Sequence, residues 1–169
     1  YDVVAVDRPD WHRLPELAAD VDAVIHLAAV NDHTESSANA RLASDLAQAV
    51  EQSPTCRRIV FSNTIHTGSG TPYGQDKAHA AEILGEVARR VDGAFVNVRL
   101  PNLFGEHARP HYNTFVATFI DAILKGEQPQ VFDRAITLLH AQEAAETLIE
   151  SLHAEATLLS PVGTPTSVA

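Results

Sequence analysis

Apolar runs that alternate with amphipathic stretches constrain the fold of this sequence most strongly. The run Val21–Ala29 is almost continuously apolar, and so is the interior of Arg58–Ser62, as expected of strands covered on both faces. Further strands are predicted over Tyr1–Asp7 and Gly93–Arg99 from their β-branched and apolar residues. Strands that alternate with helices indicate βαβ units and a parallel sheet.

Amphipathic segments separate or follow these strands. Apolar residues at helical spacing predict helices over Asn39–Glu51, Lys77–Val91, Thr114–Lys125 and Ala141–Ala154, after a short amphipathic stretch at Leu14–Ala19. The predicted fold class is therefore α/β, a Rossmann-like doubly wound parallel sheet. Such sheets bind ligands at the carboxyl ends of their strands, so functional residues are expected just after the apolar runs.

Composition narrows the class of partner and the compartment. The formal net charge of −10 argues against nucleic-acid binding, because a phosphate backbone requires a positive surface. No apolar run approaches the roughly 18 residues of a membrane span, and no signal-peptide pattern is visible. The single cysteine, Cys56, is expected to pack as a small hydrophobic residue. These features favour a cytoplasmic protein.

The nine histidines raise the question of a metal site. His107 and His111 are four positions apart, but Pro110 lies between them and disfavours a shared helix face. The sequence has no His-Glu-x-x-His motif and only one cysteine, so no metal site is expected.

The most specific motif is Tyr73-Gly-Gln-Asp-Lys77. On a helix, the first and last residues of this pentapeptide share a face. The Lys77 ammonium would then lower the pKa of the Tyr73 phenol, which could act as an acid or base near neutral pH. The alternative is a surface tyrosine and lysine at the start of a helix.

Polar residues follow two of the predicted strands. The hydroxyl of Thr64, in Ser62-Asn63-Thr64, could hydrogen-bond a substrate carbonyl or hydroxyl group, or could belong to an ordinary turn. Asn102, in the segment Arg99–Gly105, could donate a hydrogen bond to a phosphate or sugar oxygen. Alternatively, this segment is a loop shaped only by its proline and glycine.

Taken together, these motifs resemble the NAD-dependent epimerase/dehydratase family, extended short-chain dehydrogenases with a Rossmann fold. The segments that carry the resemblance are His26-Leu27-Ala28-Ala29, Tyr73-x-x-x-Lys77 and Arg99-x-x-Asn102-x-x-Gly105. Within the family, the chain is most similar to the CapF-type reductases of capsular-polysaccharide synthesis, which act on UDP-4-keto-6-deoxy-sugars. The features shared with them are the segment His26–Asn31, the short gap between Ser62-Asn63-Thr64 and Pro72-Tyr73-Gly74, and the segment Pro101–Gly105 followed by Arg109–Asn113.

The resemblance implies catalytic roles for three residues. Tyr73 would be the catalytic acid/base, Lys77 would hold the nicotinamide ribose and tune Tyr73, and Thr64 would replace the family's catalytic serine or threonine. Ile65 follows Thr64 where dehydratases of the family carry an acidic pair, which argues against a dehydratase.

The resemblance also implies binding residues. Those expected to contact the dinucleotide are Asp7, Arg8, Leu27, Ala28, Ala29 and Lys77, and those expected to contact the substrate are Asn102, Arg109, His111 and Asn113. Asp7 would favour the free 2′-hydroxyl of NAD, whereas Arg8 would favour the 2′-phosphate of NADP, so either cofactor is open. His111 is equally well interpreted as a structural loop residue.

The resemblance implies an NAD(P)H-dependent reductase of a nucleotide-activated keto-sugar that forms a homodimer. A nucleotide-sugar C4 epimerase, which would use the same residues, is the alternative. A non-catalytic dinucleotide-binding sensor is an alternative of another class. No Gly-x-x-Gly-x-x-Gly motif occurs in the sequence, so residues 1–169 are expected to be a partial NAD(P)-binding domain with the start of a small substrate-binding region. Such a chain is expected to bind a dinucleotide weakly, because this motif seats the pyrophosphate.

Overall fold

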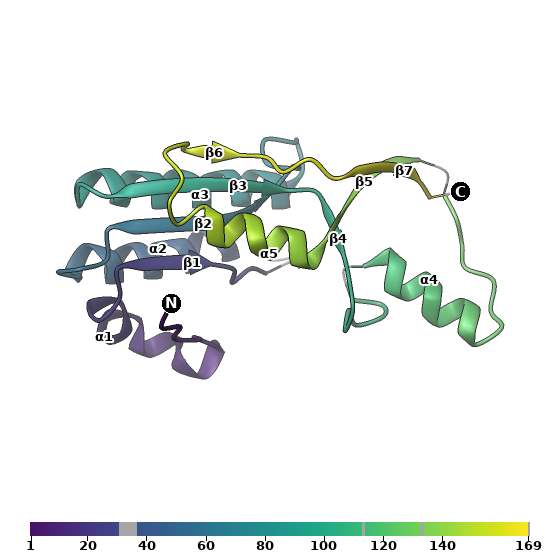
Figure 1. Cartoon of the computed structure of the whole chain (residues 1–169), viewed down its shortest axis with the longest axis horizontal. Coiled ribbons are helices and arrows are strands. Elements are labelled where there is room, and N and C mark those ends of the chain that lie inside the picture. Colours follow the sequence, from purple (N-terminus) through teal and green to yellow (C-terminus); the bar gives the residue numbers. More distant parts are fainter. Residues whose placement is uncertain (31–36, 113, 133, 169) are drawn as a thin grey trace.

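A four-stranded parallel sheet forms the centre of the molecule (Figure 1). The computed structural model describes residues 1–30, 37–112, 114–132 and 134–168. The strands of this sheet lie in the order β1 (Ala23–His26), β2 (Arg58–Thr64), β3 (Ala94–Leu100) and β6 (Leu158–Leu159), and every neighbouring pair is parallel. The carboxyl ends of β1, β2 and β3 therefore point the same way.

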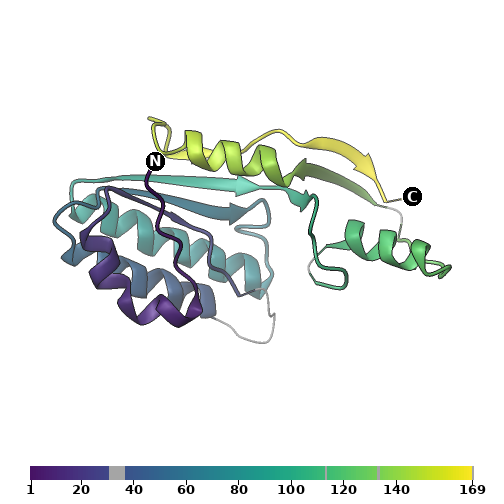
Figure 2. The ribbon, with the colours of Figure 1, turned by 60° about the horizontal axis from the view of Figure 1, so that its bottom comes forward.

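Helices cover both faces of this sheet. One face carries α1 (Leu14–Ala19), α2 (Ala38–Gln52) and α3 (Pro72–Arg90), and the other carries α5 (Ala141–Glu150), as Figure 2 shows. Along β2, Phe61 packs in the core beneath α2 and α3, whereas its neighbour Val60 packs with Leu148 of α5. This alternation makes β2 buried on both sides. The prediction of an α/β doubly wound parallel sheet is confirmed.

A smaller three-stranded sheet continues from β3. It consists of β4 (Asn102–Phe104), β5 (Ala135–His140) and β7 (Thr164–Ser167), with β5 parallel to β4 and antiparallel to β7. The helix α4 (Phe115–Leu124) lies beyond the end of the four-stranded sheet (Figure 1). The sequence analysis predicted α4 but none of these three strands.

The predicted strand at Tyr1–Asp7 is wrong. These residues form no strand and are exposed apart from the half-buried Val6, and a 3-10 helix at Arg8–Arg13 follows them. The β-branched residues of the segment have a strand propensity, but a strand also needs a neighbour to satisfy its backbone groups. Among the described residues, this segment pairs with no strand, and β1 lies at the edge of its sheet.

The helix α3 begins five residues earlier than its apolar spacing predicts. Pro72 occupies its first turn, and the hydroxyl of Thr71 accepts a hydrogen bond from the backbone of Gly74 at 3.1 Å. Proline and a capping threonine are favourable at a helix N-terminus. A side chain at position 74 would collide with the backbone carbonyl oxygen of His66, so glycine is required there. This early start places Tyr73 in the first turn of α3.

Candidate active site

Lys77 lies at the centre of the residues that follow β1 and β2. Its side chain is only 2% exposed, its Nζ donates to the backbone oxygen of Ser62 at 2.8 Å, and the same atom lies 4.1 Å from the centroid of the Phe61 ring. Burial lowers the pKa of Lys77 to about 8, an effect that the negative charge of Asp76 partly opposes. The ammonium therefore lies close to its deprotonation point near physiological pH.

An aromatic stack supports Lys77 from beneath. The His26 ring, at the end of β1, is stacked on the ring of Phe61 with 5.5 Å between centroids. His26 is 4% exposed, and burial, assisted by the positive charge of Lys77, lowers its pKa to about 4. The Lys77 ammonium thus lies over the Phe61 ring, on which the neutral His26 imidazole is stacked. This cation–π arrangement keeps Lys77 at the end of β2.

Tyr73 differs from its prediction in one respect. Its phenol is partly buried, and its pKa is raised, first by burial and then by the negative charge of Asp76. The prediction that Lys77 lowers this pKa is therefore not met in the structure. The reason is geometric, because the Lys77 side chain is directed toward Ser62 and Phe61. Tyr73 is accordingly a protonated phenol at neutral pH.

The sequence analysis missed a buried carboxylate inside the motif. Asp76, 8% exposed, accepts hydrogen bonds from the backbone and side-chain nitrogens of Asn39, each at 2.9 Å, and from the backbone nitrogen of Ala40 at 3.0 Å. The same Asn39 amide accepts from the backbone nitrogen of Val30 and donates to its oxygen. These contacts join α3, the start of α2 and the segment after β1 into one unit. The position of Asp76 in the sequence, three residues after Tyr73, did not indicate that its carboxylate joins these elements.

Thr64 lies at the carboxyl end of β2, two residues beyond the carbonyl that binds Lys77. Its backbone nitrogen donates to the side-chain oxygen of Asn63 at 2.8 Å, and its hydroxyl oxygen accepts from the backbone nitrogen of His66 at 3.2 Å. The second of these hydrogen bonds positions the hydroxyl oxygen. Thr64 therefore lies at the end of β2 where the Lys77 Nζ binds the Ser62 carbonyl.

The residues expected to contact the dinucleotide fall into two groups. Leu27, Ala28 and Ala29 directly follow β1, and Leu27 is 62% exposed. Asp7 and Arg8 are exposed where the 3-10 helix begins, and the Trp11 ring of that helix lies 6.1 Å from the His26 ring. The first group adjoins the Lys77 site directly.

The residues expected to contact substrate belong to the smaller sheet and the segment before α4. The Asn102 side chain donates to the backbone oxygen of Thr137 on β5 at 3.2 Å. The Arg109 guanidinium lies 6.0 Å from the Tyr112 ring. His111 binds Asp121 of α4 at 3.3 Å and has a positive φ of 58°. These contacts give Asn102 and His111 structural partners. Asn113 lies outside the described residues.

The described residues form neither a metal-ion cluster nor a membrane-spanning helix. Within the described residues, no group of three or more histidine, cysteine, aspartate or glutamate side chains is arranged to hold a metal ion. None of the described helices has the length and apolar character needed to cross a membrane.

Cys56 is fully buried in the core, as predicted, and burial raises the pKa of its thiol.

Comparison with known proteins relates this geometry to a family. The model of the NAD dependent epimerase/dehydratase family matches residues 2–158. A Pseudomonas aeruginosa protein, UDP-2-acetamido-2,6-beta-L-arabino-hexul-4-ose reductase, is 30% identical over 143 residues, which are 81% of this chain and 38% of the relative.

Solved structures share the fold. UDP-N-acetylglucosamine 4-epimerase from Methanobrevibacter ruminantium superposes with a TM-score of 0.79 at 21% identity, over 92% of this chain and 59% of that one. The capsular polysaccharide assembling protein CapF from Staphylococcus aureus gives a TM-score of 0.73 at 24% identity, over 92% and 44%. The chain thus spans 38% of the curated relative and less than two thirds of these two structures.

Proposed function

Because this chain belongs to the NAD-dependent epimerase/dehydratase family, we propose that it serves a reductase that transfers hydride from NADH or NADPH to the keto group of a nucleotide-activated sugar. The relative from Pseudomonas aeruginosa carries this proposal, since its name describes the reduction of a UDP-linked 4-keto sugar and it is 30% identical over most of this chain. Low-identity structural likeness to epimerases supports the fold alone.

The residues after β1 and β2 fit the nicotinamide end of a dinucleotide. Lys77 is a buried ammonium that binds the Ser62 carbonyl of β2, and Ala28 and Ala29, which follow β1, are small, partly buried residues. The sequence holds no Gly-x-x-Gly-x-x-Gly motif, the usual cradle of the pyrophosphate at a helix N-terminus. The fit therefore concerns the nicotinamide ribose, which Lys77 would hold. When bound, the reduced dinucleotide supplies the hydride.

Tyr73 is the proton donor in this proposal. Reduction of a ketone places negative charge on the carbonyl oxygen, and a protonated phenol can transfer its proton there. The pKa of Tyr73 is raised by burial, so the phenol is protonated before the reaction. Lys77 would hold the nicotinamide ribose, and Thr64 would orient the sugar oxygen by a hydrogen bond.

The C4 epimerase is the second candidate and would use the same three residues. The two functions differ in cofactor turnover, because a reductase consumes one reduced dinucleotide for every product molecule, whereas an epimerase consumes none. A non-catalytic dinucleotide-binding sensor would bind the cofactor without changing the sugar.

The test follows the absorbance of NADPH and of NADH with a UDP-4-keto-6-deoxy-sugar. It compares this chain with a chimera in which this chain replaces the matching segment of the Pseudomonas aeruginosa relative. We expect the sugar to oxidise the cofactor in the chimera, and Tyr73→Phe to lower the rate at least 100-fold, the lower range of acid–base contributions. Tyr112→Phe is the matched control at an exposed tyrosine. Equal rates for Tyr73→Phe and Tyr112→Phe would refute the role of Tyr73.

A further inference from the structure

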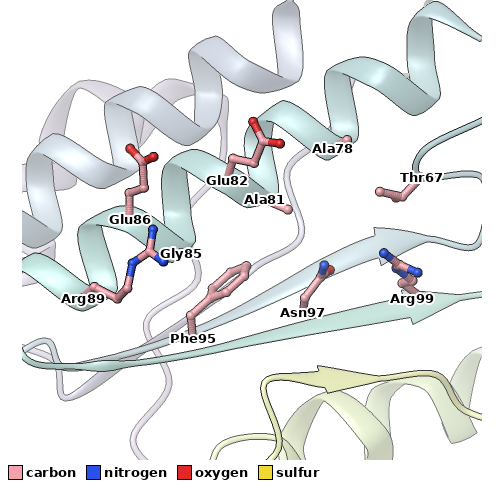
Figure 3. A pocket seen from close by; sticks show the side chains of 10 residues that line it. All are labelled: Thr67, Ala78, Ala81, Glu82, Gly85, Glu86, Arg89, Phe95, Asn97 and Arg99. Carbon is pink, nitrogen blue, oxygen red and sulfur yellow. The ribbon is translucent and has the colours of Figure 1, made fainter.

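We propose that a groove between α3 and β3, separate from the Lys77 site, binds a small organic carboxylate. The groove has a volume of about 400 Å³ (Figure 3), within the range of small-molecule sites. Its polar end is formed by Arg99, Asn97 and Thr67, and its wall by Phe95 and the α3 residues that face β3. None of these residues belongs to the proposed catalytic set, so this inference does not depend on the proposed function.

Arg99 provides the main argument for an anionic ligand. Its Nε atom is buried and has no hydrogen-bond partner. Within the part of the chain that the structure describes, its guanidinium also makes no ion pair. A guanidinium without a partner is costly to bury, and a carboxylate can pair with its terminal nitrogens through two parallel hydrogen bonds. The Arg99 side chain lies at one end of the lining of the groove, as Figure 3 shows.

Two neighbouring side chains are held in place for such a ligand. The Asn97 side-chain oxygen accepts from the Asn63 side-chain nitrogen at 2.9 Å, and the Thr67 hydroxyl donates to the Asn63 oxygen at 2.5 Å. With its oxygen engaged in this way, Asn97 has its NH₂ group left to donate. The polar end of the groove thus offers donors from Arg99 and Asn97 on adjacent β3 positions of one face.

The remainder of the groove favours a flat apolar body with a single negative charge. The Phe95 ring, Ala78 and Ala81 form its walls, and a side chain at Gly85 would come within 3.3 Å of that ring. The carboxylates of two glutamates, Glu82 and Glu86, stand on the α3 side of the groove. The Arg89 guanidinium also lines the groove. The two acidic and two basic side chains of the lining balance, which leaves no excess positive charge for a multiply charged anion such as a phosphate ester. A monocarboxylate with a planar apolar group therefore fits the groove best.

The groove and the Lys77 site lie on different flanks of α3. Lys77 extends toward Ser62 and Phe61 of β2, whereas Ala78 and Ala81 face Phe95 and Asn97 of β3. The two sites are lined by different side chains, so the two proposals can be tested with different variants.

The test titrates sodium benzoate into the ¹⁵N-labelled chain and follows backbone amide shifts, with benzamide as the uncharged probe of the same shape. We expect benzoate to shift amides of Phe95–Arg99 and of the facing α3 turn, and benzamide to bind at least tenfold more weakly. Arg99→Gln should raise the Kd for benzoate at least tenfold. Arg90→Gln is the matched control, because Arg90 pairs with Glu51 and does not line the groove; it should leave the Kd unchanged.

A second variant tests the site without removing Arg99. Ala81→Glu places a carboxylate on α3 in the groove, and we expect it to abolish benzoate binding while the fold is retained. Three results would each overturn the proposal: no benzoate-dependent shifts in the groove, equal affinity for benzoate and benzamide, or an unchanged Kd in the folded Arg99→Gln variant.

Discussion

Asp76 is the residue on which the geometry of the candidate site depends most, and Asp76→Ala is the sharpest test of that statement. In the wild-type chain its carboxylate accepts hydrogen bonds from three buried donors, two on Asn39 and one on Ala40, at 2.9–3.0 Å. Removing the carboxylate leaves these donors without their acceptor, at about 1–3 kcal/mol for each buried unsatisfied group. Some of this loss is recovered as water reaches the start of α2, so we expect about 3–5 kcal/mol in total.

That loss is a large part of the roughly 5–15 kcal/mol that stabilises a typical domain. The assay is urea unfolding followed by far-UV circular dichroism, with the free energy of unfolding extrapolated to water. Asp76→Asn, which keeps one acceptor oxygen, should lose about half as much. Gln75→Ala, at an exposed neighbouring position, should change stability by less than about 0.5 kcal/mol. If Asp76→Ala lies within about 1 kcal/mol of wild type, Asp76 does not organise the site.

Three further predictions concern single groups of the site. The chain has two lysines, whose pKa values can be measured by ¹³Cε-lysine NMR. Lys77 should titrate at about 8 because of its burial, and Lys125, whose pKa is raised by Asp121, should titrate above its ordinary value. Two superimposable titration curves would contradict the burial of Lys77. The unfolded chain protonates His26 near its ordinary pKa and the folded chain only at about 4, so the free energy of unfolding falls as the pH drops through this window. That loss should be about 2 kcal/mol between pH 7 and pH 5, and urea unfolding of His26→Phe should lack it. Gly74→Ala should destabilise the chain by about 1–3 kcal/mol in the same assay because its new side chain meets a backbone carbonyl, despite the better helix propensity of alanine; a stabilised variant would show that this close approach relaxes freely.

The central sheet was predictable because its signals are local. The strands at β2 and β3 are short apolar runs between helices, and the predicted helix Asn39–Glu51 differs from the observed Ala38–Gln52 by one residue at each end. In each case a long periodic segment and a buried face indicate the same element. The α/β alternation was therefore visible before any tertiary contact was known.

The elements that failed depend on partners distant in the sequence. The Tyr1–Asp7 segment has strand-forming residues but no pairing partner among the described residues. Conversely, β5 at Ala135–His140 forms between β4 and β7, which contribute only short or proline-containing segments with weak signals of their own. Strand propensity reflects mostly the packing of a strand against neighbouring strands. When those neighbours are distant in the sequence, a short stretch of residues does not reveal them.

The position of the Tyr73–Lys77 motif in the fold was more predictable than its electrostatics. The Tyr73–Lys77 motif lies where the sequence placed it, at the start of a helix that follows a buried strand. The direction of the Tyr73 pKa could not be predicted, since it depends on burial and on which way Lys77 points. The stack of His26 on Phe61 and the contacts of Asp76 were likewise missed, because they join residues from separate elements.

Hydride transfer to the sugar is the central claim of this account. The most direct measurement supplies NADPH and NADH deuterated at the reactive C4 position to the chimera described above, with a UDP-4-keto-6-deoxy-sugar, and weighs the product by mass spectrometry. The account predicts one deuterium in each product molecule, an equal amount of oxidised dinucleotide, and loss of both in Tyr73→Phe. Unreduced keto-sugar without deuterium and without oxidised dinucleotide would contradict the reductase.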